Sequence, residues 1–583
     1  MIVLGISDSI TSGATLIADG TILAAVSEER LNRQKMAMGF PQKSIAEVLK
    51  IAALDMQDVD HIAVATNSLF WQPEARKIED YFRDSRGVMR DAVLSSGSFF
   101  AKWSGDKHIS RKLYYELKKV LTRSRRQKIR ETLERDFHYN GKISFIDHHL
   151  SHCASAYFTS GLNSATVISL DGAGDGCSSH VYRVCDGKFQ LLNTIDSYDS
   201  IGNYYAYVTH ICGFKAHKHE GKITGLAAYG TQSYVNLFRN YLCYEAGKIK
   251  NTGACFDWSA IKKLQRDLGD GFRKEDLAAS MQYILEELCT QYVDYWVQRS
   301  AIADVALAGG VCANVKLNQR LHELSAVHSL FIHPGMGDEG LATGAALFKC
   351  FQLCQEAHTP FAWGEIDHVY WGAESSEAEI ERAIRAAGYA YEYHPNIAEK
   401  IARLLAAGKI VARYDGRMEY GPRALGNRSI LYQTIDPTVN HWLNKKLQRT
   451  EFMPFAPVTL HEYANQCYTH IQGAEIPARF MTITFDCTEW MKKHCPAVVH
   501  VDGTARPQLI DRATNPRYYQ ILDEYRKMTG LPSIINTSFN MHEEPIVCTA
   551  EEALRAFRAS ELDYLAMQRF LVPRQAYGAG GSA

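Results

Sequence analysis

The sequence predicts an α/β protein built from at least two domains. A unit made of a strand, a small-residue turn at an acid and a hairpin occurs twice before residue 355, and helices alternate with strands after residue 375. The chain of 583 residues also exceeds one ordinary core, and its 46% hydrophobic content is ample to bury more than one.

The repeated unit begins at residue 2 and again at residue 165. In the first copy, a strand over residues 2–8 ends in an aspartate, and residues 14–18 and 21–26 are expected to pair around an Asp-Gly turn. In the second copy, a strand over residues 165–171 returns through residues 180–192. Such a duplication is typical of the actin, sugar-kinase and chaperone-ATPase superfold, whose ribonuclease H-like lobes clamp a nucleotide.

A further strand is expected at residues 305–311, followed by a helix. It opens onto Gly309 and Gly310, which lack the side chains that would keep a ligand away from the backbone. We expect these glycines, with Asn314 beside them, to contact adenosine.

Two histidines indicate a metal site. Asp147 is expected to cap a helix that places His148 and His152 on one face, four residues apart. His149 faces the other way and either packs or supports the metal ligands from behind. No glutamate follows the first histidine, so the metalloprotease motif is absent. Two exposed histidines on a helix are the alternative interpretation.

Two aspartates favour the metal interpretation. Asp171 and Asp338 both stand beside glycines at the end of a strand or in a loop, which leaves their carboxylates free to point into a cleft. Two histidines and two carboxylates suit iron(II), manganese or zinc better than calcium, and we expect iron(II).

The segment 416–430 predicts an anion site. Its arginines Arg417, Arg423 and Arg428 are spaced by glycines, and planar guanidinium groups suit phosphate oxygens. A structural turn with arginines paired to acids is the alternative. Later residues add cations and neutral donors to the same expected polyphosphate site: Lys446, Arg449, Arg506, Ser538 and Asn540.

Two other segments are less specific. Glycines surround His217, His219, Glu220 and Lys222 within residues 213–230, so this segment holds substrate or is a surface loop before a capped helix. Residues 82–137 are basic and amphipathic, but acids interleave and aromatic platforms are sparse. We therefore interpret them as a solvated helical insertion rather than a nucleic-acid-binding surface.

Composition excludes several classes of partner. The chain has 64 basic and 65 acidic side chains, a formal net charge of −1, so no overall field attracts nucleic acid or an anionic membrane. No apolar run approaches the roughly 20 residues that a membrane-spanning helix needs. The 14 cysteines form no Cys-x-x-Cys pair and no presequence is recognisable, so we expect a soluble cytoplasmic protein.

Long motifs in a fixed order resemble one family. They are Gly416-Arg-Met-Glu-Tyr-Gly-Pro-Arg-Ala-Leu-Gly-Asn-Arg-Ser429, Pro-Phe-Ala-Pro at 454–457, Arg506-Pro-Gln, Asn-Thr-Ser-Phe-Asn at 536–540 and His-His-Leu-Ser-His at 148–152. Together they resemble the NodU/CmcH carbamoyltransferases of nodulation-factor and antibiotic biosynthesis, over nearly the whole chain.

The resemblance implies three parts. Residues 1–355 would form an actin/sugar-kinase-like domain similar to the tRNA threonylcarbamoyl-transferase, and residues 375–550 a YrdC-like α/β domain. Residues 551–583 would return to the first domain. The YrdC-like domain would make carbamoyl adenylate from carbamoyl phosphate and ATP with magnesium. The first domain would transfer the carbamoyl group to a hydroxyl, or less often an amine, of a small natural product. A homodimer is compatible with the resemblance.

The family's roles carry over onto matching positions. The metal role falls on His148, His152, Asp171 and Asp338, and a substrate-loop role on Glu220 and Lys222. The resemblance assigns adenylate formation to the following residues: Arg417, Arg423, Arg428, Lys446, Arg449, Arg506 and Ser538.

One departure leaves the general base open. Many members have a His-Asp pair in the first hairpin turn, where this chain has Ile10 and Thr11. The base is then His217, His219 or the metal-bound acceptor itself, or the transfer step is slower. Two rival functions also remain: a small-molecule kinase of the same superfold, and a nucleotide-dependent binding protein related to tRNA threonylcarbamoylation.

Overall fold

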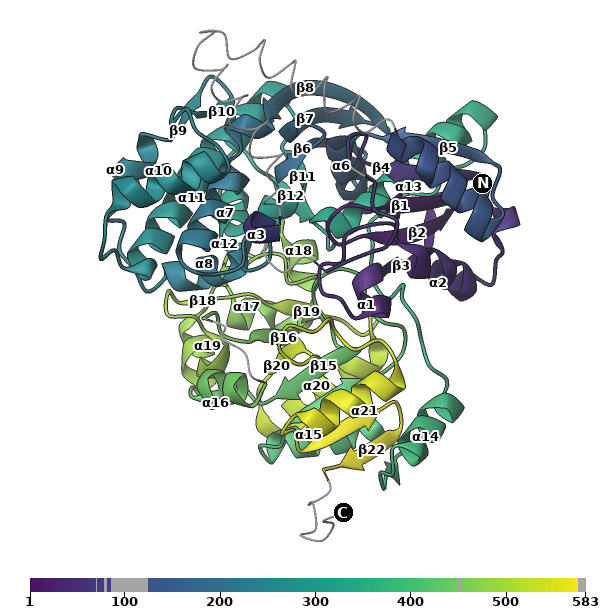
Figure 1. The fold of residues 1–583 in the computed structure, drawn as a ribbon. Helices are drawn as coiled ribbons and strands as arrows, with labels where there is room; N and C mark the ends of the chain where they lie inside the picture. The colour runs from purple at the N-terminus through teal and green to yellow at the C-terminus, as the bar shows by residue number, and fades with distance from the viewer. Residues whose placement is uncertain (70, 78–80, 85–123, 448–451, 575–583) are drawn as a thin grey trace. The chain divides into compact units, whose positions relative to one another are not determined.

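The computed structural model describes residues 1–69, 71–77, 81–84, 124–447 and 452–574 (Figure 1). The chain forms two compact units, Met1–Ile366 and Asp367–Ala583. Both units contain sheets and helices, so the predicted α/β class is confirmed. Within the described ranges, no helix is both long enough and apolar enough to cross a bilayer.

The first unit contains two five-stranded sheets with the same pattern of strand directions. Their orders are β3-β2-β1-β4-β5 and β12-β11-β6-β7-β8. In each sheet three antiparallel strands continue into two parallel ones. The first sheet consists of β1 (Ile2–Ser7), β2 (Gly13–Ala18), β3 (Thr21–Ser27), β4 (His61–Ala65) and β5 (Lys142–Ile146). The second consists of β6 (Ser164–Gly174), β7 (Cys177–Cys185), β8 (Lys188–Asp196), β11 (Asp304–Ala308) and β12 (Ser329–Ile332).

Asp-Gly pairs form the tight turns of both sheets. Ala18 pairs with Thr21, so Asp19 (φ 49°) and Gly20 (φ 93°) are the two loop residues of the first hairpin. Asp186 and Gly187 repeat this arrangement between β7 and β8, with φ values of 47° and 74°. Positive φ at both positions is what a twisted two-residue hairpin requires, so the predicted hairpin turns are confirmed.

Two helices, α6 (His148–Thr159) and α13 (Leu341–Ala357), pack against each other in the first unit (Figure 1). Helix α6 lies on β6, β7 and β11, whereas α13 lies on β1, β2 and β4. The contacts are close because glycines occupy them. A Cβ at Gly344 of α13 would lie 1.7 Å from the carbonyl oxygen of Ser151, and one at Gly5 would lie 2.0 Å from that of Ala342. This packing brings the N-terminal ends of α6 and α13 together.

Other helices complete the first unit. They include α2 (Gln42–Ala52), α7 (Ile201–Ile211), α8 (Glu220–Ala227), α9 (Val235–Arg239), α10 (Trp258–Leu268), α11 (Lys274–Ser300) and α12 (Val315–His322), with a small hairpin of β9 (Leu242–Glu245) and β10 (Lys248–Asn251). The long helix α11 packs against α7, α8, α9 and α12. The nearly continuous row of buried residues in its first half explains this central position.

The expected solvated helix describes only one face of residues 124–137, on which Arg126, Lys128 and Arg130 are exposed. Residues 124–137 form a helix on which Arg125, Ile129 and Leu133, spaced four apart, are all fully buried. Residues 85–123, including the predicted basic helix from 111 to 121, lie outside the described part of the chain.

The second unit contains an eight-stranded mixed sheet in the order β13-β22-β21-β14-β15-β20-β16-β19. Helices α15 (Ile397–Ala406) and α20 (Pro516–Thr529) pack over it through a shared apolar core. The strands are β13 (Glu392–Tyr393), β14 (Val411–Tyr414), β15 (Arg428–Tyr432), β16 (Ala456–Leu460), β19 (Gln508–Ile510), β20 (Ser533–Ser538), β21 (Tyr564–Met567) and β22 (Phe570–Pro573). The remaining helices include α14 (Glu377–Ala386), α16 (Val439–Lys446), α19 (Glu489–His494) and α21 (Ala550–Ala559).

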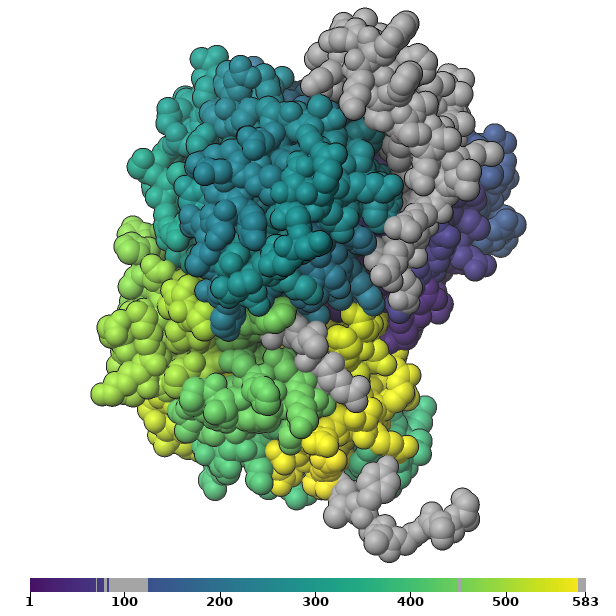
Figure 2. All heavy atoms as spheres, turned by 60° about the vertical axis from the view of Figure 1, so that its left-hand side comes forward, coloured from purple at the N-terminus to yellow at the C-terminus, as the bar shows by residue number. Residues whose placement is uncertain are grey.

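The C-terminal segment corrects an expectation. We expected residues 551–583 to return to the first domain, but within the described residues 551–574, β21 pairs in parallel with β14, and β22 pairs with β21 and β13. Figure 2 shows yellow C-terminal atoms packed beside green atoms of the same unit. The physical reason is that Leu565, Ala566, Leu571 and Val572 fill this unit's core, at 1% exposure or less.

Candidate metal centre and arginine loop

Helix α6 begins as the sequence predicted. The side chain of Asp147 accepts a hydrogen bond from the backbone N–H of Leu150 at 2.9 Å and so caps the helix. His148 and His152 then lie one turn apart and are both buried, so the interpretation as exposed surface histidines is wrong. His149 is buried as well, and its Nδ1 forms a hydrogen bond with the Ser169 hydroxyl at 3.0 Å.

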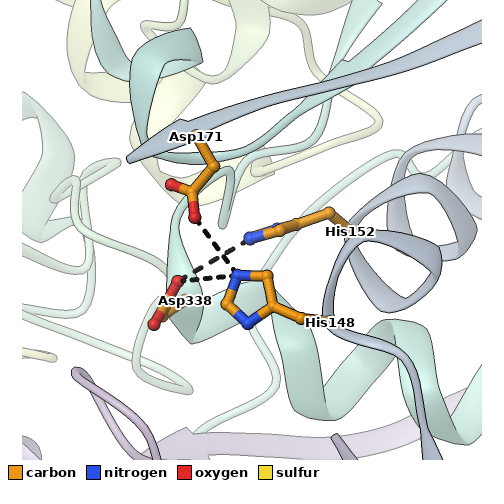
Figure 3. A group of neighbouring side chains, drawn as sticks. All are labelled: His148, His152, Asp171 and Asp338. Carbon is orange, nitrogen blue, oxygen red and sulfur yellow. Dashed lines mark hydrogen bonds and ion pairs between the residues drawn. The ribbon is translucent and has the colours of Figure 1, made fainter. Parts of the chain in front are cut away.

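Four side chains converge beside α6, and two of them, His148 and His152, belong to α6 itself (Figure 3). Asp171 comes from β6, and Asp338 comes from the turn before α13. One ligand atom from each of His148, His152, Asp171 and Asp338 lies within 4.8 Å of all the others. The Nε2 atom of His148 is 3.2 Å from Asp171 Oδ2, and both histidine Nε2 atoms are 3.7 Å from Asp338 Oδ1. The structure therefore brings together all four residues of the predicted site.

The outer oxygen of each carboxylate is held by its own partner. Asp171 Oδ1 accepts the backbone N–H of Gly310 at 2.8 Å, and Asp338 Oδ2 accepts the hydroxyl of Ser9 at 2.9 Å. The other oxygen of each aspartate faces the histidines. This arrangement aims one lone-pair-bearing oxygen of each acid into the cluster. Sequence reasoning missed Ser9, because a serine in a hairpin turn carries no distinctive signal.

Charge is distributed unevenly among the buried histidines. Burial opposes protonation of His148, but the carboxylates of Asp338 and Asp171 outweigh it and raise its pKa to about 9. Burial alone would raise the pKa of Asp171, yet the neighbouring histidines lower it well below the ordinary range. The pKa of His149 falls far below its usual value, first because it is buried and then because His148 is close.

The four residues fit a bound cation. Among the described residues, neither ring nitrogen of the buried His152 has a hydrogen-bond partner. An imidazole buried in this way leaves a polar atom unsatisfied, unless a ligand is present. Two imidazoles and two carboxylates are a donor set for a first-row divalent metal such as iron(II), manganese or zinc.

The expected nucleotide-contacting residues also have structural roles. A Cβ at Gly309 (φ 104°) would lie 2.2 Å from the carbonyl oxygen of Leu170, so the strand β6 leaves no room for a side chain there. Asn314 caps α12 by accepting from the backbone of Leu317, and its Nδ2 donates to Gln282 at 2.8 Å. Gly310, by contrast, directs its N–H at Asp171 and so supports the metal cluster.

The substrate-loop candidates lie at the start of α8. Burial raises the pKa of Glu220 to about 7, and its Oε1 accepts the backbone N–H of His217 at 2.6 Å. Lys222 is buried with its ammonium 5.7 Å from the centroid of the Phe214 ring. A Cβ at Gly172 would lie 3.6 Å from the His217 ring, which places His217 beside the residue that follows Asp171. His219 Nδ1 accepts the backbone N–H of Lys215.

Two arginines of segment 416–430 shape the loop itself. Arg428 is fully buried, donates to the carbonyl oxygens of Asp415 and Gly416, and stacks 3.8 Å from the centroid of Tyr414. Arg417 donates to the carbonyl oxygens of Trp371 and Gly372. The alternative interpretation of this segment was a structural turn whose arginines pair with acids. Arg417 and Arg428 instead donate hydrogen bonds to backbone carbonyl oxygens, so part of each guanidinium group holds the loop.

A buried carboxylate that sequence reasoning missed organises the same loop. Glu419 Oε1 accepts three backbone N–H groups, those of Leu425, Asn427 and Arg428, at 2.9, 2.7 and 3.1 Å. Only the three-dimensional path of the loop reveals this role, because one glutamate among arginines looks like a simple countercharge. The Glu419 carboxylate therefore fixes the backbone of residues 425–428.

The remaining candidates of the second unit are spread over several elements. Ser538 ends β20 and pairs with Ser429, the neighbour of Arg428. Lys446 ends α16 and donates to the Glu561 carbonyl oxygen at 3.3 Å, and Asn540 donates to the carbonyl oxygens of Met541 and Glu544. Arg423 and Arg506 are half-buried. Arg449 lies outside the described residues.

Family models cover most of the chain. The carbamoyltransferase N-terminus matches residues 2–347, and the carbamoyltransferase C-terminus matches residues 402–574. The chain belongs to the carbamoyltransferase family. The resemblance drawn from the motifs is thereby confirmed at the level of the family.

Two relatives match nearly the whole of this chain. Nodulation protein NolNO of Sinorhizobium fredii is 31% identical over 96% of this chain and 78% of its own. The uncharacterized protein sll1178 of Synechocystis is 32% identical over 97% of this chain and 95% of its own. Among solved structures, full-length HypF in a phosphate- and nucleotide-bound form has a TM-score of 0.36 at 13% identity, covering 60% of this chain and 46% of HypF.

Proposed function

We propose that this carbamoyltransferase uses ATP to make carbamoyl adenylate from carbamoyl phosphate, and then transfers the carbamoyl group to a hydroxyl, or an amine, of a small natural product. Adenylate formation is assigned to the second unit and transfer to the first. Family membership supports carbamoyl transfer, and the converging His148, His152, Asp171 and Asp338 carry the assignment of the transfer site.

The first step needs positive charge near phosphate groups. Water would release carbamate and phosphate from carbamoyl phosphate, and a carbamate oxygen would attack the α-phosphorus of ATP, so that pyrophosphate leaves. Two anions approach each other in this reaction, and cationic side chains reduce their repulsion. Arg423 and Arg506 are our candidates for this contact, whereas Arg417 and Arg428 hold the loop and contribute their positive charge to it.

The second step needs an activated carbonyl. The acceptor oxygen would attack the carbamoyl carbon, AMP would leave, and the acceptor proton would pass to a base. A divalent ion held by the four residues would supply Lewis-acid polarisation. The chain itself fixes the donors, because Gly310 and Ser9 orient the two carboxylates. His217 is our candidate base, since it lies beside Gly172.

Product analysis tests the proposal. The full chain is incubated with ATP, magnesium and carbamoyl phosphate in an extract of small molecules, and the products are followed by mass spectrometry. We expect AMP and pyrophosphate to form only with carbamoyl phosphate, together with a molecule heavier by one carbamoyl unit. Release of ADP with a phosphorylated acceptor would instead identify a kinase. Nucleotide binding without any modified product would identify a binding protein.

A further inference from the structure

Thr66 forms an unusual contact with the metal-site helix. It follows β4 directly, and its hydroxyl forms a 3.0 Å hydrogen bond with Nδ1 of His148. The opposite ring nitrogen, Nε2, faces Asp171 and Asp338. When Nε2 binds a cation, the proton of the imidazole stays on Nδ1, and the Nδ1–H group donates a hydrogen bond to the hydroxyl oxygen of Thr66. The hydroxyl is therefore placed to fix both the tautomer and the rotation of this imidazole.

The backbone of Thr66 is strained. Its φ of 70° lies in the left-handed region, which β-branched residues rarely adopt. Such a conformation persists only when the surroundings impose it, and it is found most often at functional sites. Here the strained backbone turns the side chain of Thr66 toward His148.

Arg125 supplies the restraint. It is fully buried and donates to the Thr66 carbonyl oxygen at 2.6 Å and to that of Ala65 at 3.1 Å. The same guanidinium holds both oxygens of Asp8, at 2.9 and 2.5 Å. One planar group thereby ties together the end of β4, the end of β1 and the helix of residues 124–137.

A second contact fixes the other end of His148. Its backbone N–H donates to Asp175 Oδ2 at 2.9 Å, and the carboxylate of Asp175 also accepts the backbone N–H groups of Asn67 and Ser68. The residues that follow Thr66 are thus joined to the first residue of α6. The Asp175 carboxylate therefore links the loop 66–68 to the start of α6.

We propose that Thr66 is a positioning residue for His148, held in place by Arg125, so that the helix of residues 124–137 helps to set the geometry of the metal centre. The inference rests on the proposed metal site. It assigns a role to a segment whose sequence suggested only a solvated insertion.

Cobalt(II) binding to the full-length apo-protein tests the proposal, with affinity and visible absorption as readouts that need no substrate. Thr66→Val keeps the shape and the β-branching but removes the hydroxyl. We expect it to weaken cobalt binding about 10- to 100-fold and to change the absorption spectrum, since partners of metal ligands typically contribute that much. Thr66→Ser restores the hydroxyl and should return both readouts to near the wild-type values. Arg125→Lys keeps the positive charge but loses the planar guanidinium group that bonds to Asp8, Ala65 and Thr66 together. It should also weaken cobalt binding.

Matched variants separate this inference from general destabilisation and from the proposed function. Thr209→Val makes the same change at another buried threonine, whose hydroxyl donates a hydrogen bond to the carbonyl oxygen of Tyr205 within α7, and this variant should bind cobalt normally. Wild-type affinity in Thr66→Val, or an equal loss in Thr209→Val, would overturn the role of Thr66. His148→Ala must lose binding. If it does not, the metal site itself is wrong.

Discussion

Removing the Arg125 guanidinium should destabilise the first unit strongly. In Arg125→Met the side chain keeps much of its volume, but Asp8 is left buried without its partner. The side chains of the two residues are 0% and 1% exposed. Breaking a buried ion pair from one side typically costs about 3–5 kcal/mol, because an uncompensated charge remains inside the protein.

Hydrogen exchange of the backbone amides in β1 and β4 measures this cost locally. At about 1.4 kcal/mol per factor of ten, the expected change is exchange faster by roughly a hundred- to a few-thousand-fold. Arg403→Met is the control. Its pair with Glu399 lies on the surface, with side chains 67% and 39% exposed, and such pairs contribute about 0–1 kcal/mol.

A double variant makes the reasoning stricter. Asp8→Leu combined with Arg125→Met leaves no charge behind, so it should exchange more slowly than Arg125→Met alone. If Arg125→Met exchanges like Arg403→Met, or if the double variant is worse than the single one, the buried pair does not act as described.

Three other perturbations have expected outcomes. Burial lowers the pKa of His333 to about 3, so the stability that its neutral form contributes is present above pH 6.5 and is lost as the pH falls. The His333→Gln variant has no such group. Its free energy of unfolding, measured by denaturant titration, should therefore depend less steeply on pH between pH 6 and 4.5, by about 1.4 kcal/mol per pH unit. Gly344→Ala forces α6 and α13 apart and should cost about 1–3 kcal/mol, seen as a lower midpoint of thermal unfolding; an unchanged midpoint would contradict the close contact. Glu419→Gln keeps an oxygen acceptor but removes its charge, so carbamoyl-phosphate-dependent pyrophosphate release should fall while cobalt binding stays normal; loss of both would mean a wider structural effect.

Local signals in the sequence were sufficient for much of the fold. Asp-Gly pairs specify their hairpins through backbone preferences alone, and Asp147 caps α6 through a contact three residues away. The helix α15, Ile397–Ala406, likewise agrees with the alternation of helices and strands expected after residue 375. These features depend on near neighbours, which are visible in a sequence.

Long-range partners were not predictable in this way. Arg125 lies in a basic stretch that looks solvated, yet its partner Asp8 is 117 residues away. The sequence suggested that Arg428 binds anions, but several N–H groups of its guanidinium donate hydrogen bonds to the backbone of the loop. The pairing of β21 with β14 depends on a strand register that the composition of residues 564–567 does not reveal. The four-residue cluster was found because glycines flank both acids.

The central claim is that two separate sites perform two successive steps. Its most direct test compares Arg506→Ala with His148→Ala in two assays: carbamoyl-phosphate-dependent release of pyrophosphate from ATP, and carbamoylation of small molecules from supplied carbamoyl adenylate. We predict that Arg506→Ala loses the first activity and keeps the second, and that His148→Ala shows the opposite pattern. Loss of both activities in either variant, with the fold intact, would contradict the division of labour.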